Sequence, residues 1–139
     1  MRCLGLDLGT KTLGLAISDK SNIIASPLKV LRYNNDDYNE LFKELDIIIK
    51  QNDITTLVLG LPKNMNNSLG FAAERSMKFK TALEERYKLP VELVDERLST
   101  VEAENYLLNA DVSRQKRKKV IDGIAASIIL DTYLKMKGN

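Results

Sequence analysis

The start of the chain alternates between hydrophobic and small or polar residues, which predicts three strands. Over residues 3–9, leucines occupy one face while Gly5, Asp7 and Gly9 occupy the other. A tight turn at residues 9–11 and a second alternating run over residues 13–18 predict a β-hairpin. A third extended stretch covers residues 23–33. Pro27 lies within it and predicts an edge strand, because proline cannot donate a hydrogen bond to a central ladder.

The middle of the chain changes to helical spacing and then to a continuous apolar run. Asp36 and Asp37 are candidate N-cap residues for a helix that ends near residues 52–53. Its apolar residues are Leu41, Leu45, Ile48 and Ile49. The run over residues 55–60 is typical of a parallel strand that is buried on both faces.

The second half of the chain predicts three more helices and one more strand. A helix over residues 71–87 carries one stripe, formed by Ala72, Ser76, Phe79, Leu83 and Tyr87. Pro90 ends it before a strand over residues 91–94. The Ser-x-x-Glu sequence at residues 99–102 is a capping box for a short helix that reaches about residue 109. Ser113 can cap a last long helix, whose apolar face is formed by Ile121, Ile124, Ala125 and Ile128.

The element order therefore predicts an α/β fold in a single domain that covers residues 1–139. A mixed five-stranded sheet of order 3-2-1-4-5, flanked by helices, satisfies the order of strands and helices. A chain of 139 residues with 44% hydrophobic content is long enough for one core and too short for two ordinary domains.

The amino-acid composition limits the types of catalytic and metal site that this chain can form. The chain has no histidine and one cysteine, Cys3, which excludes Ser-His triads, Cys/His zinc sites and an internal disulfide. Acid–base and metal chemistry must then use carboxylates, lysines and hydroxyls. Because 21 basic residues nearly balance 19 acidic residues, a nucleic-acid partner must be argued locally. We expect a soluble cytoplasmic protein, since no leader or membrane-length apolar run is present.

Asp7 is the first candidate for chemistry. It is a carboxylate in the middle of a strand, between Gly5 and Gly9, where the small residues leave room for a ligand. The turn that follows can present backbone N–H groups and Lys11 to a phosphate. The alternative is a solvated acid on an exposed sheet face.

The second candidate is the sequence Asp95-Glu96-Arg97 at the end of the fifth strand, where open α/β sheets bind ligands. Neighbouring residues on a strand face opposite sides, so one of the two acids joins a given site. Arg97 can hold a phosphate. An ion pair between Glu96 and a cation such as Arg97 is the structural alternative.

Asp122 is the third candidate. It precedes Gly123 inside the long helix, where glycine costs about 1 kcal/mol relative to alanine and so indicates a close approach. Lys118 and Lys119 share its side of the helix and belong to a basic run that starts at Arg114. This combination fits a metal beside a phosphate backbone, and a solvated basic helix end is the alternative.

If the last helix packs across the sheet near the first strand, Asp7, Asp122 and one acid of the 95–97 triplet meet. Hard oxygen ligands without histidine suit Mg²⁺ or Mn²⁺, and two such ions can activate a water for phosphodiester hydrolysis.

Four segments of the chain resemble the YqgF proteins, also called RuvX, which are Holliday-junction-resolvase-like members of the ribonuclease H superfamily. They are GLDLGTKTLGLAISD at residues 5–19, GLPKNM at 60–65, DERLST at 95–100 and KVIDGIAA at 119–126 with Ile129-Leu130. The resemblance spans nearly the whole chain. It implies a ribonuclease-H-like fold and a bacterial cytoplasmic nuclease that processes the 5′ end of pre-16S rRNA, with resolution of four-way DNA junctions as the alternative.

The resemblance also implies which residues act. Asp7, Glu96 and Asp122 match the acidic positions expected to carry catalysis and hold the metal, with Asp95 as a substitute for Glu96. RuvC-type resolvases have an acid at the end of the fourth strand, where this chain has Gly60-Leu61-Pro62. We expect backbone phosphates to be bound by Lys11, Arg97, Arg114, Lys118 and Lys119.

Two other functions remain open on the sequence. Asp7-Leu8-Gly9-Thr10 also resembles the phosphate-binding turn of ATP-using proteins of the actin and hexokinase superfamily, although those need two such domains. The other is a nucleic-acid-binding module without catalysis. Few aromatic residues are available for stacking on bases, which favours recognition of a duplex or junction by its shape. We expect the protein to act as a monomer or a homodimer.

Overall fold

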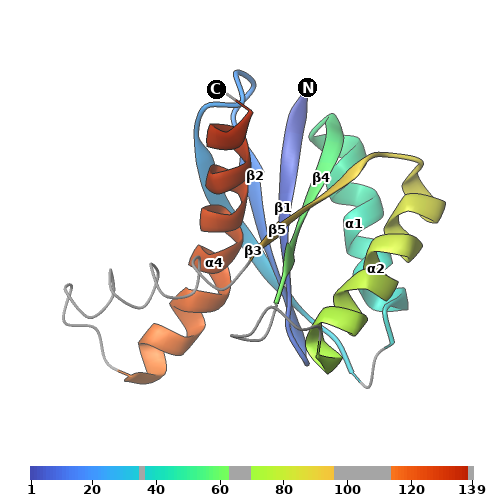
Figure 1. The fold of residues 1–139 in the computed structure, drawn as a ribbon, viewed down its shortest axis with the longest axis vertical. Helices are drawn as coiled ribbons and strands as arrows, with labels where there is room; N and C mark the ends of the chain where they lie inside the picture. Colours follow the sequence, from blue (N-terminus) through green and yellow to red (C-terminus); the bar gives the residue numbers. More distant parts are fainter. Residues whose placement is uncertain (35–36, 63–69, 96–113, 138–139) are drawn as a thin grey trace.

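The computed structural model describes residues 1–34, 37–62, 70–95 and 114–137, with the backbone alone for residues 114–123. Five strands form one sheet in the order β3-β2-β1-β4-β5, which confirms the predicted order (Figure 1). They are β1 (Arg2–Leu8), β2 (Thr12–Ser18), β3 (Ala25–Arg32), β4 (Ile54–Leu61) and β5 (Val91–Asp95). The β1–β2 and β2–β3 pairs are antiparallel, whereas β4 pairs in parallel with β1 and β5. The sheet is therefore mixed.

Strand β3 lies at one edge of the sheet, as Pro27 predicts. Pro27 pairs with Ala16 at a register shift in the β2–β3 ladder. An edge strand tolerates proline because one side of its backbone has no neighbouring strand.

In the described residues, helices α1 (Asn39–Gln51), α2 (Phe71–Tyr87) and α4 (Arg114–Met136) cover the two faces of the sheet (Figure 1). Helices α1 and α2 lie on one face, and α4 crosses the other. The N-cap of α1 is Tyr38, so the assignment of the cap to Asp36 or Asp37 is wrong by at least one residue. Asp37 still satisfies one helix amide, since its Oδ1 accepts a hydrogen bond of 3.1 Å from the Asn39 N–H.

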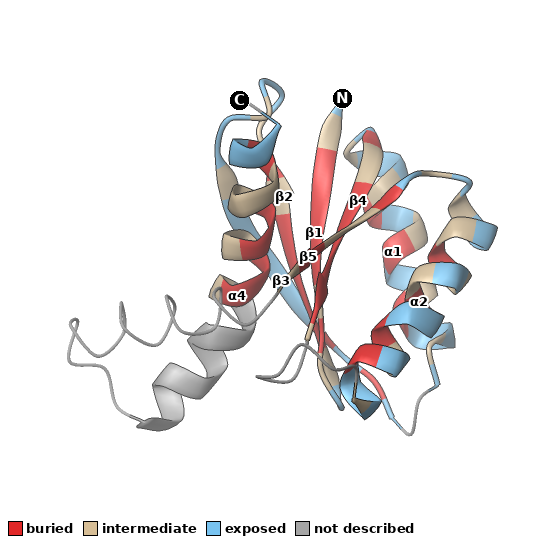
Figure 2. Ribbon diagram, viewed as in Figure 1, coloured by how far each residue is buried: buried red, intermediate tan, exposed pale blue. Residues whose placement is uncertain are grey.

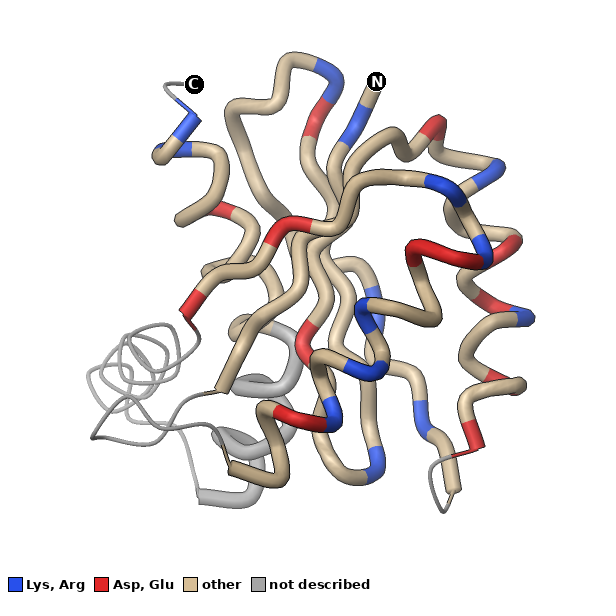
Figure 3. Tube along the Cα trace, turned by 45° about the vertical axis from the view of Figure 1, so that its right-hand side comes forward, with Lys and Arg blue, Asp and Glu red and all other residues tan. Residues whose placement is uncertain are grey.

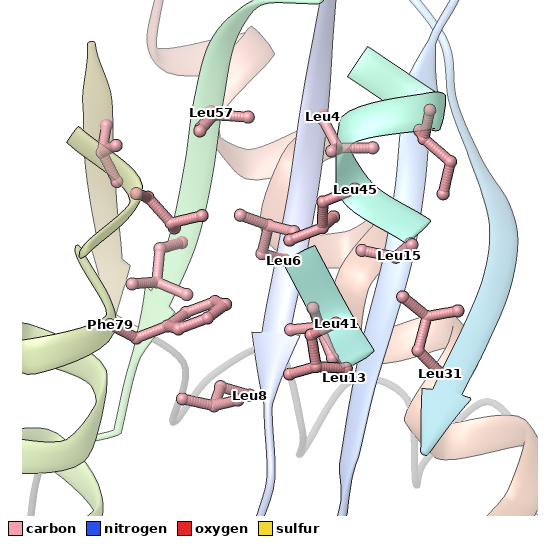
Figure 4. Close-up of a cluster of buried hydrophobic side chains, with 14 of the residues drawn as sticks. Leu4, Leu6, Leu8, Leu13, Leu15, Leu31, Leu41, Leu45, Leu57 and Phe79 are labelled. Carbon is pink, nitrogen blue, oxygen red and sulfur yellow. The ribbon is translucent and has the colours of Figure 1, made fainter. Parts of the chain in front are cut away.

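Two hydrophobic cores hold these layers together (Figures 2 and 4). The larger core packs leucines of β1, β2 and β4 against α1 and α2 around Phe79. The smaller core lies under α4 and contains Cys3, Ala16, Val58, Val94, Ala126, Ile129, Leu130 and Leu134. Leu57, Val58 and Leu59 of β4 are fully buried, which confirms that this strand is covered on both faces.

The buried stripes of two helices differ from the predicted ones. In α2 the first buried residue is Ala73, whereas Ala72 is exposed. In α4 the buried residues are Ala125, Ala126, Ile129, Leu130 and Leu134. Ile124 and Ile128 are only half-buried, so the buried face of α4 is rotated relative to the predicted one. The reason is that the sheet requires a small residue where α4 comes closest to it. The predicted short helix at residues 99–109, Ser113 and the side chain of Ile121 lie outside the described residues.

Cys3 is buried beneath α4. Burial raises the pKa of its thiol, although hydrogen bonding to Ser18 opposes that effect. In the part of the chain that the structure describes, no helix is both long enough and apolar enough to span a membrane.

Candidate active site

Asp7 lies on the α4 face of the sheet. It is half-buried in β1 and shares its face with Cys3 and Gly5, which pack towards α4. Its partner on β2 is Gly14. On the other side, β4 places Leu59 beside Leu6, so the next residue, Gly60, flanks Asp7. Asp7 therefore lies in the sheet between two positions that carry no side chain.

The turn that follows Asp7 is fixed by hydrogen bonds. The Gly9 N–H donates to the Thr12 carbonyl at 2.8 Å, and the Tyr33 N–H donates to the Lys11 carbonyl at 3.0 Å. The Tyr33 hydroxyl also donates to the Gly9 carbonyl. The Gly9 amide is thus used inside the turn, and the prediction that other groups of the turn bind a phosphate then concerns the remaining amides and Lys11. Lys11 is exposed at the tip.

Helix α4 makes its closest approach to the sheet at Gly5. A Cβ added there would lie 2.8 Å from the Ala126 carbonyl oxygen and 2.9 Å from the Leu130 Cβ. Further along α4, Tyr133 comes close enough to Cys3 and Glu92 for their charges to raise its pKa, after the larger effect of burial. Since Tyr133 faces the start of β1 and Ala126 faces Gly5, α4 runs antiparallel to β1.

This direction places the backbone of Asp122 near the level of Asp7. Asp122 precedes Ala126 by four residues, about 6 Å along a helix. Asp7 follows Gly5 by two residues, about 6.6 Å along a strand in the same direction. The side chain of Asp122 and that of Gly123 lie outside the described part.

Asp95 ends β5 on the face opposite to Asp7. Val94 packs into the core under α4, whereas Val91 and Leu93 pack into the core under α1 and α2. Alternation along the strand assigns Asp95 to the face of Val91 and Leu93. Glu96 and Arg97 follow directly and lie outside the described residues.

The described side chains alone do not form a metal centre. Within residues 1–34, 37–62, 70–95 and 124–137, no three acidic or cysteine side chains group closely enough to hold an ion. Of Asp7, Glu96 and Asp122, Asp7 is the one whose side chain lies in the described part, as does the side chain of Asp95, the substitute for Glu96. The carboxylate oxygens of Asp7 match the donors that Mg²⁺ and Mn²⁺ prefer. Of the expected phosphate-binding residues, Arg114, Lys118 and Lys119 begin α4 with the backbone alone described.

Three cations that the sequence analysis did not select lie at the same end of the sheet as Asp7. Arg32 ends β3 beside Thr12, and Arg75 and Lys78 lie in the first turns of α2. We call these three residues and Lys11 the basic rim; none of the four forms an ion pair with a described acid. Figure 3 shows basic positions at the lower end of the molecule and also at its upper end. In the sequence, the feature that could have indicated two of these cations is the i, i+3 spacing of Arg75 and Lys78 at the start of a helix.

Comparison with known proteins decides the family. A family model for RuvX, described as Holliday junction resolvase, matches residues 1–136. The chain belongs to the RuvX family. Two RuvX relatives carry the name "Putative pre-16S rRNA nuclease". The one from Geobacillus kaustophilus is 50% identical over 137 residues, covering 99% of both chains. The one from Staphylococcus epidermidis is 52% identical over 134 residues, covering 96% of this chain and 94% of the relative.

Solved structures agree with the ribonuclease-H-like fold of this RuvX chain. T. thermophilus RuvC in complex with a Holliday junction substrate has a TM-score of 0.61 at 13% identity and covers 99% of this chain and 96% of its own. The fowlpox virus Holliday junction resolvase has a TM-score of 0.53 at 15% identity and covers 98% and 99%. At these identities the likeness shows the fold alone.

Proposed function

We propose that this RuvX-family chain is a metal-dependent nuclease that processes the 5′ end of pre-16S rRNA in the cytoplasm. The observation that carries the proposal is the position of Asp7. It lies in the sheet between Gly14 and the position of Gly60, two residues without side chains, on the face that α4 crosses. Relatives that share about half of the chain's residues over nearly its full length carry the name "Putative pre-16S rRNA nuclease".

Asp7, Glu96 and Asp122 form the proposed catalytic set. The antiparallel course of α4 over β1 supports Asp122, because it brings that turn of the helix to the level of Asp7. The face of Asp95 supports Glu96 as the second acid. Asp95 alternates with Val94, which packs beneath α4, so Asp95 itself lies on the face away from Asp7.

These three carboxylates would hold Mg²⁺ or Mn²⁺. Such ions supply an activated water and stabilise the departing oxygen of a phosphodiester. The residues of the chain position these ions and bind the substrate. The carboxylates position the cations, while Lys11, Arg97, Arg114, Lys118 and Lys119 bind and orient the backbone phosphates. No histidine is present to act as a general base, so proton removal depends on the carboxylate cluster.

Resolution of a four-way DNA junction is the second candidate function. The description of the RuvX family model favours it, as does the fold shared with junction-bound resolvases. A third candidate, a nucleic-acid-binding module without catalysis, differs from both because it requires no metal.

The test is cleavage of two substrates with added Mg²⁺ or Mn²⁺: a 5′-extended 16S rRNA precursor and a four-way DNA junction. We expect the native protein to cut the precursor. Asp7→Asn, Glu96→Gln and Asp122→Asn should each lower the rate by about 100-fold or more. Asp95→Asn tests the choice between neighbouring acids and should remain active. Asp53→Asn, an exposed acid at the opposite end of the sheet, is the matched control.

Each outcome separates the candidates. Cutting of the junction but not of the precursor would support the resolvase, and binding without cutting would support the module. Equal activity in all variants would show that a contaminating nuclease is responsible.

A further inference from the structure

An exposed aromatic pocket lies at the start of α2, apart from the acidic site. It has a volume of about 370 Å³ and is lined by Tyr38, Phe71, Glu74, Arg75 and Lys78. The side chain of Phe71 is 89% exposed, the highest value among the large hydrophobic residues described. Burying an aromatic ring is strongly favourable, so a phenylalanine left in water next to two cations indicates a surface that is covered when a ligand binds.

Tyr38, which also lines the pocket, is held in place by the core. The Tyr38 ring lies 5.5 Å from Tyr33 and 5.0 Å from Phe79, measured between ring centroids. Tyr33 and Phe79 are themselves buried, and Tyr33 bonds to the turn that follows Asp7. A rigid aromatic wall loses little conformational entropy when a flat group stacks against it.

The charges around the pocket select the ligand. Arg75 and Lys78 belong to the basic rim and form no ion pair with a described acid, so their charges are available to an anion. Glu74 also lines the pocket; its carboxylate repels a phosphate and can accept a hydrogen bond from a base amino group. An aromatic ring, a base-edge acceptor and two cations together match an unpaired nucleotide with its backbone.

We infer that this pocket binds a single-stranded extension of the nucleic acid, with a base stacked on Phe71 and phosphates at Arg75 and Lys78. The inference rests on the proposed function and names a part of its substrate. Figure 1 shows the first turn of α2 at the same end of the sheet as the C-terminal end of β1, which carries Asp7. A strand that leaves the acidic site can therefore pass around this end of the sheet to the opposite face. A precursor with an unpaired end is better suited to this surface than a fully paired duplex.

The test compares two labelled RNA hairpins with one stem, one blunt and one with a 5′ single-stranded extension. Binding is measured with EDTA present, so that the result does not depend on cleavage. The native protein should bind the extended hairpin about tenfold more tightly than the blunt one. Phe71→Ala should abolish this difference without weakening blunt binding, whereas Phe71→Tyr should preserve it. Lys78→Gln should weaken binding of the extended hairpin more than that of the blunt one.

Two controls match these changes in chemistry and exposure. Ile47→Ala removes an exposed hydrophobic side chain from α1, and Lys50→Gln removes an exposed lysine at the far end of that helix. Neither should alter the preference for the extension. Equal affinity for both hairpins in the native protein would overturn the inference. So would an unchanged preference in Phe71→Ala; if that variant also changed the oligomeric state, Phe71 would belong to a protein contact.

Failure of this inference differs from failure of the proposed function. Loss of the extension preference leaves cleavage by Asp7, Glu96 and Asp122 intact. Absence of cleavage with an intact preference removes the nuclease and leaves a binding surface.

Discussion

The Gly5 Cα and the Ala126 carbonyl face one another so closely that no side chain fits between them. A methyl group at Gly5 would lie 2.8 Å from that backbone oxygen, which cannot move without moving α4. We expect Gly5→Ala to lower the free energy of unfolding by about 2 kcal/mol, as overpacking does in other cores. It should also lower nuclease activity beyond this loss of stability, because α4 carries Asp122. Urea denaturation and cleavage assays measure the two effects.

Gly9→Ala is the matched control for that substitution. Its added Cβ would meet only Thr12, at 3.3 Å and 3.4 Å. We expect a cost below about 1 kcal/mol, since small adjustments relieve such contacts. Equal losses in the two variants would contradict the importance of the contact with α4.

Two buried serines are expected to respond to alanine with opposite signs. The Ser76 Oγ is buried without a hydrogen-bond partner, whereas the Ser18 Oγ accepts from the Cys3 N–H at 2.8 Å and donates to Asn22 Oδ1 at 2.7 Å. Ser76→Ala should raise the free energy of unfolding by about 1 kcal/mol, because it removes an unsatisfied polar group. Ser18→Ala should lower it by about 1–3 kcal/mol, because it strands a buried amide. Chemical denaturation of both variants checks the signs.

Asp46 links α1 to α2 and should make stability depend on pH under acidic conditions. Arg86 donates to both oxygens of the Asp46 carboxylate, at 2.9 Å and 2.7 Å, and the Tyr87 hydroxyl donates at 2.7 Å. The hydrogen bonds from Arg86 lower the pKa of Asp46, more than burial raises it. In the pH range between the folded and unfolded pKa values the unfolded chain binds more protons. The stabilisation is therefore complete above the unfolded pKa and is lost as pH falls through the folded pKa.

Asp46→Asn should remove this pH dependence. Since the Asp46 and Arg86 side chains are 43% and 44% exposed, solvent screens the pair, and the loss at neutral pH should be about 0.5 kcal/mol. Unfolding free energies measured from pH 7 to pH 2 should fall less steeply in the variant than in the native protein. Parallel curves would show that Asp46 contributes nothing through its charge.

The two hairpin turns offer a matched pair of lysines for nucleic-acid binding. Lys11 lies in the β1–β2 turn at the Asp7 end, and Lys20 lies in the β2–β3 turn at the opposite end. If Lys11 contacts a phosphate, Lys11→Gln should reduce the slope of log affinity against log salt by about 1, while Lys20→Gln should leave it unchanged. Equal slopes in all three proteins would exclude that contact.

The sheet was predictable because each strand carried its own signal. Alternating leucines, Pro27 and the apolar run of β4 determine face, edge position and burial locally. The buried face of α4 was not predictable in the same way. Its sequence after Gly123 is apolar on several sides, and the close contact with Gly5, more than 100 residues away, decides which side packs.

In the candidate site, too, some residues could be predicted from the local sequence and others only from the structure. Asp7 could be selected from the sequence, because an acid in the middle of a strand between Gly5 and Gly9 has small neighbours that leave room for a ligand. The sequence resemblance proposed Glu96 with Asp95 as its substitute, and the packing of β5 adds that Asp95 lies on the face opposite to Val94. Arg75 and Lys78 become candidates for phosphate binding only because the start of α2 lies at the Asp7 end of the sheet (Figure 1).

The single thiol of the chain gives the protein a built-in reporter. Cys3 is shielded by the same helix that carries Asp122, so a thiol reagent reaches it only when α4 lifts from β1 or the whole domain unfolds. The rate at which such a reagent modifies native protein therefore measures how often the helix detaches. Comparing this rate with and without nucleic acid would tell whether the substrate holds α4, which carries Asp122, against β1, which carries Asp7.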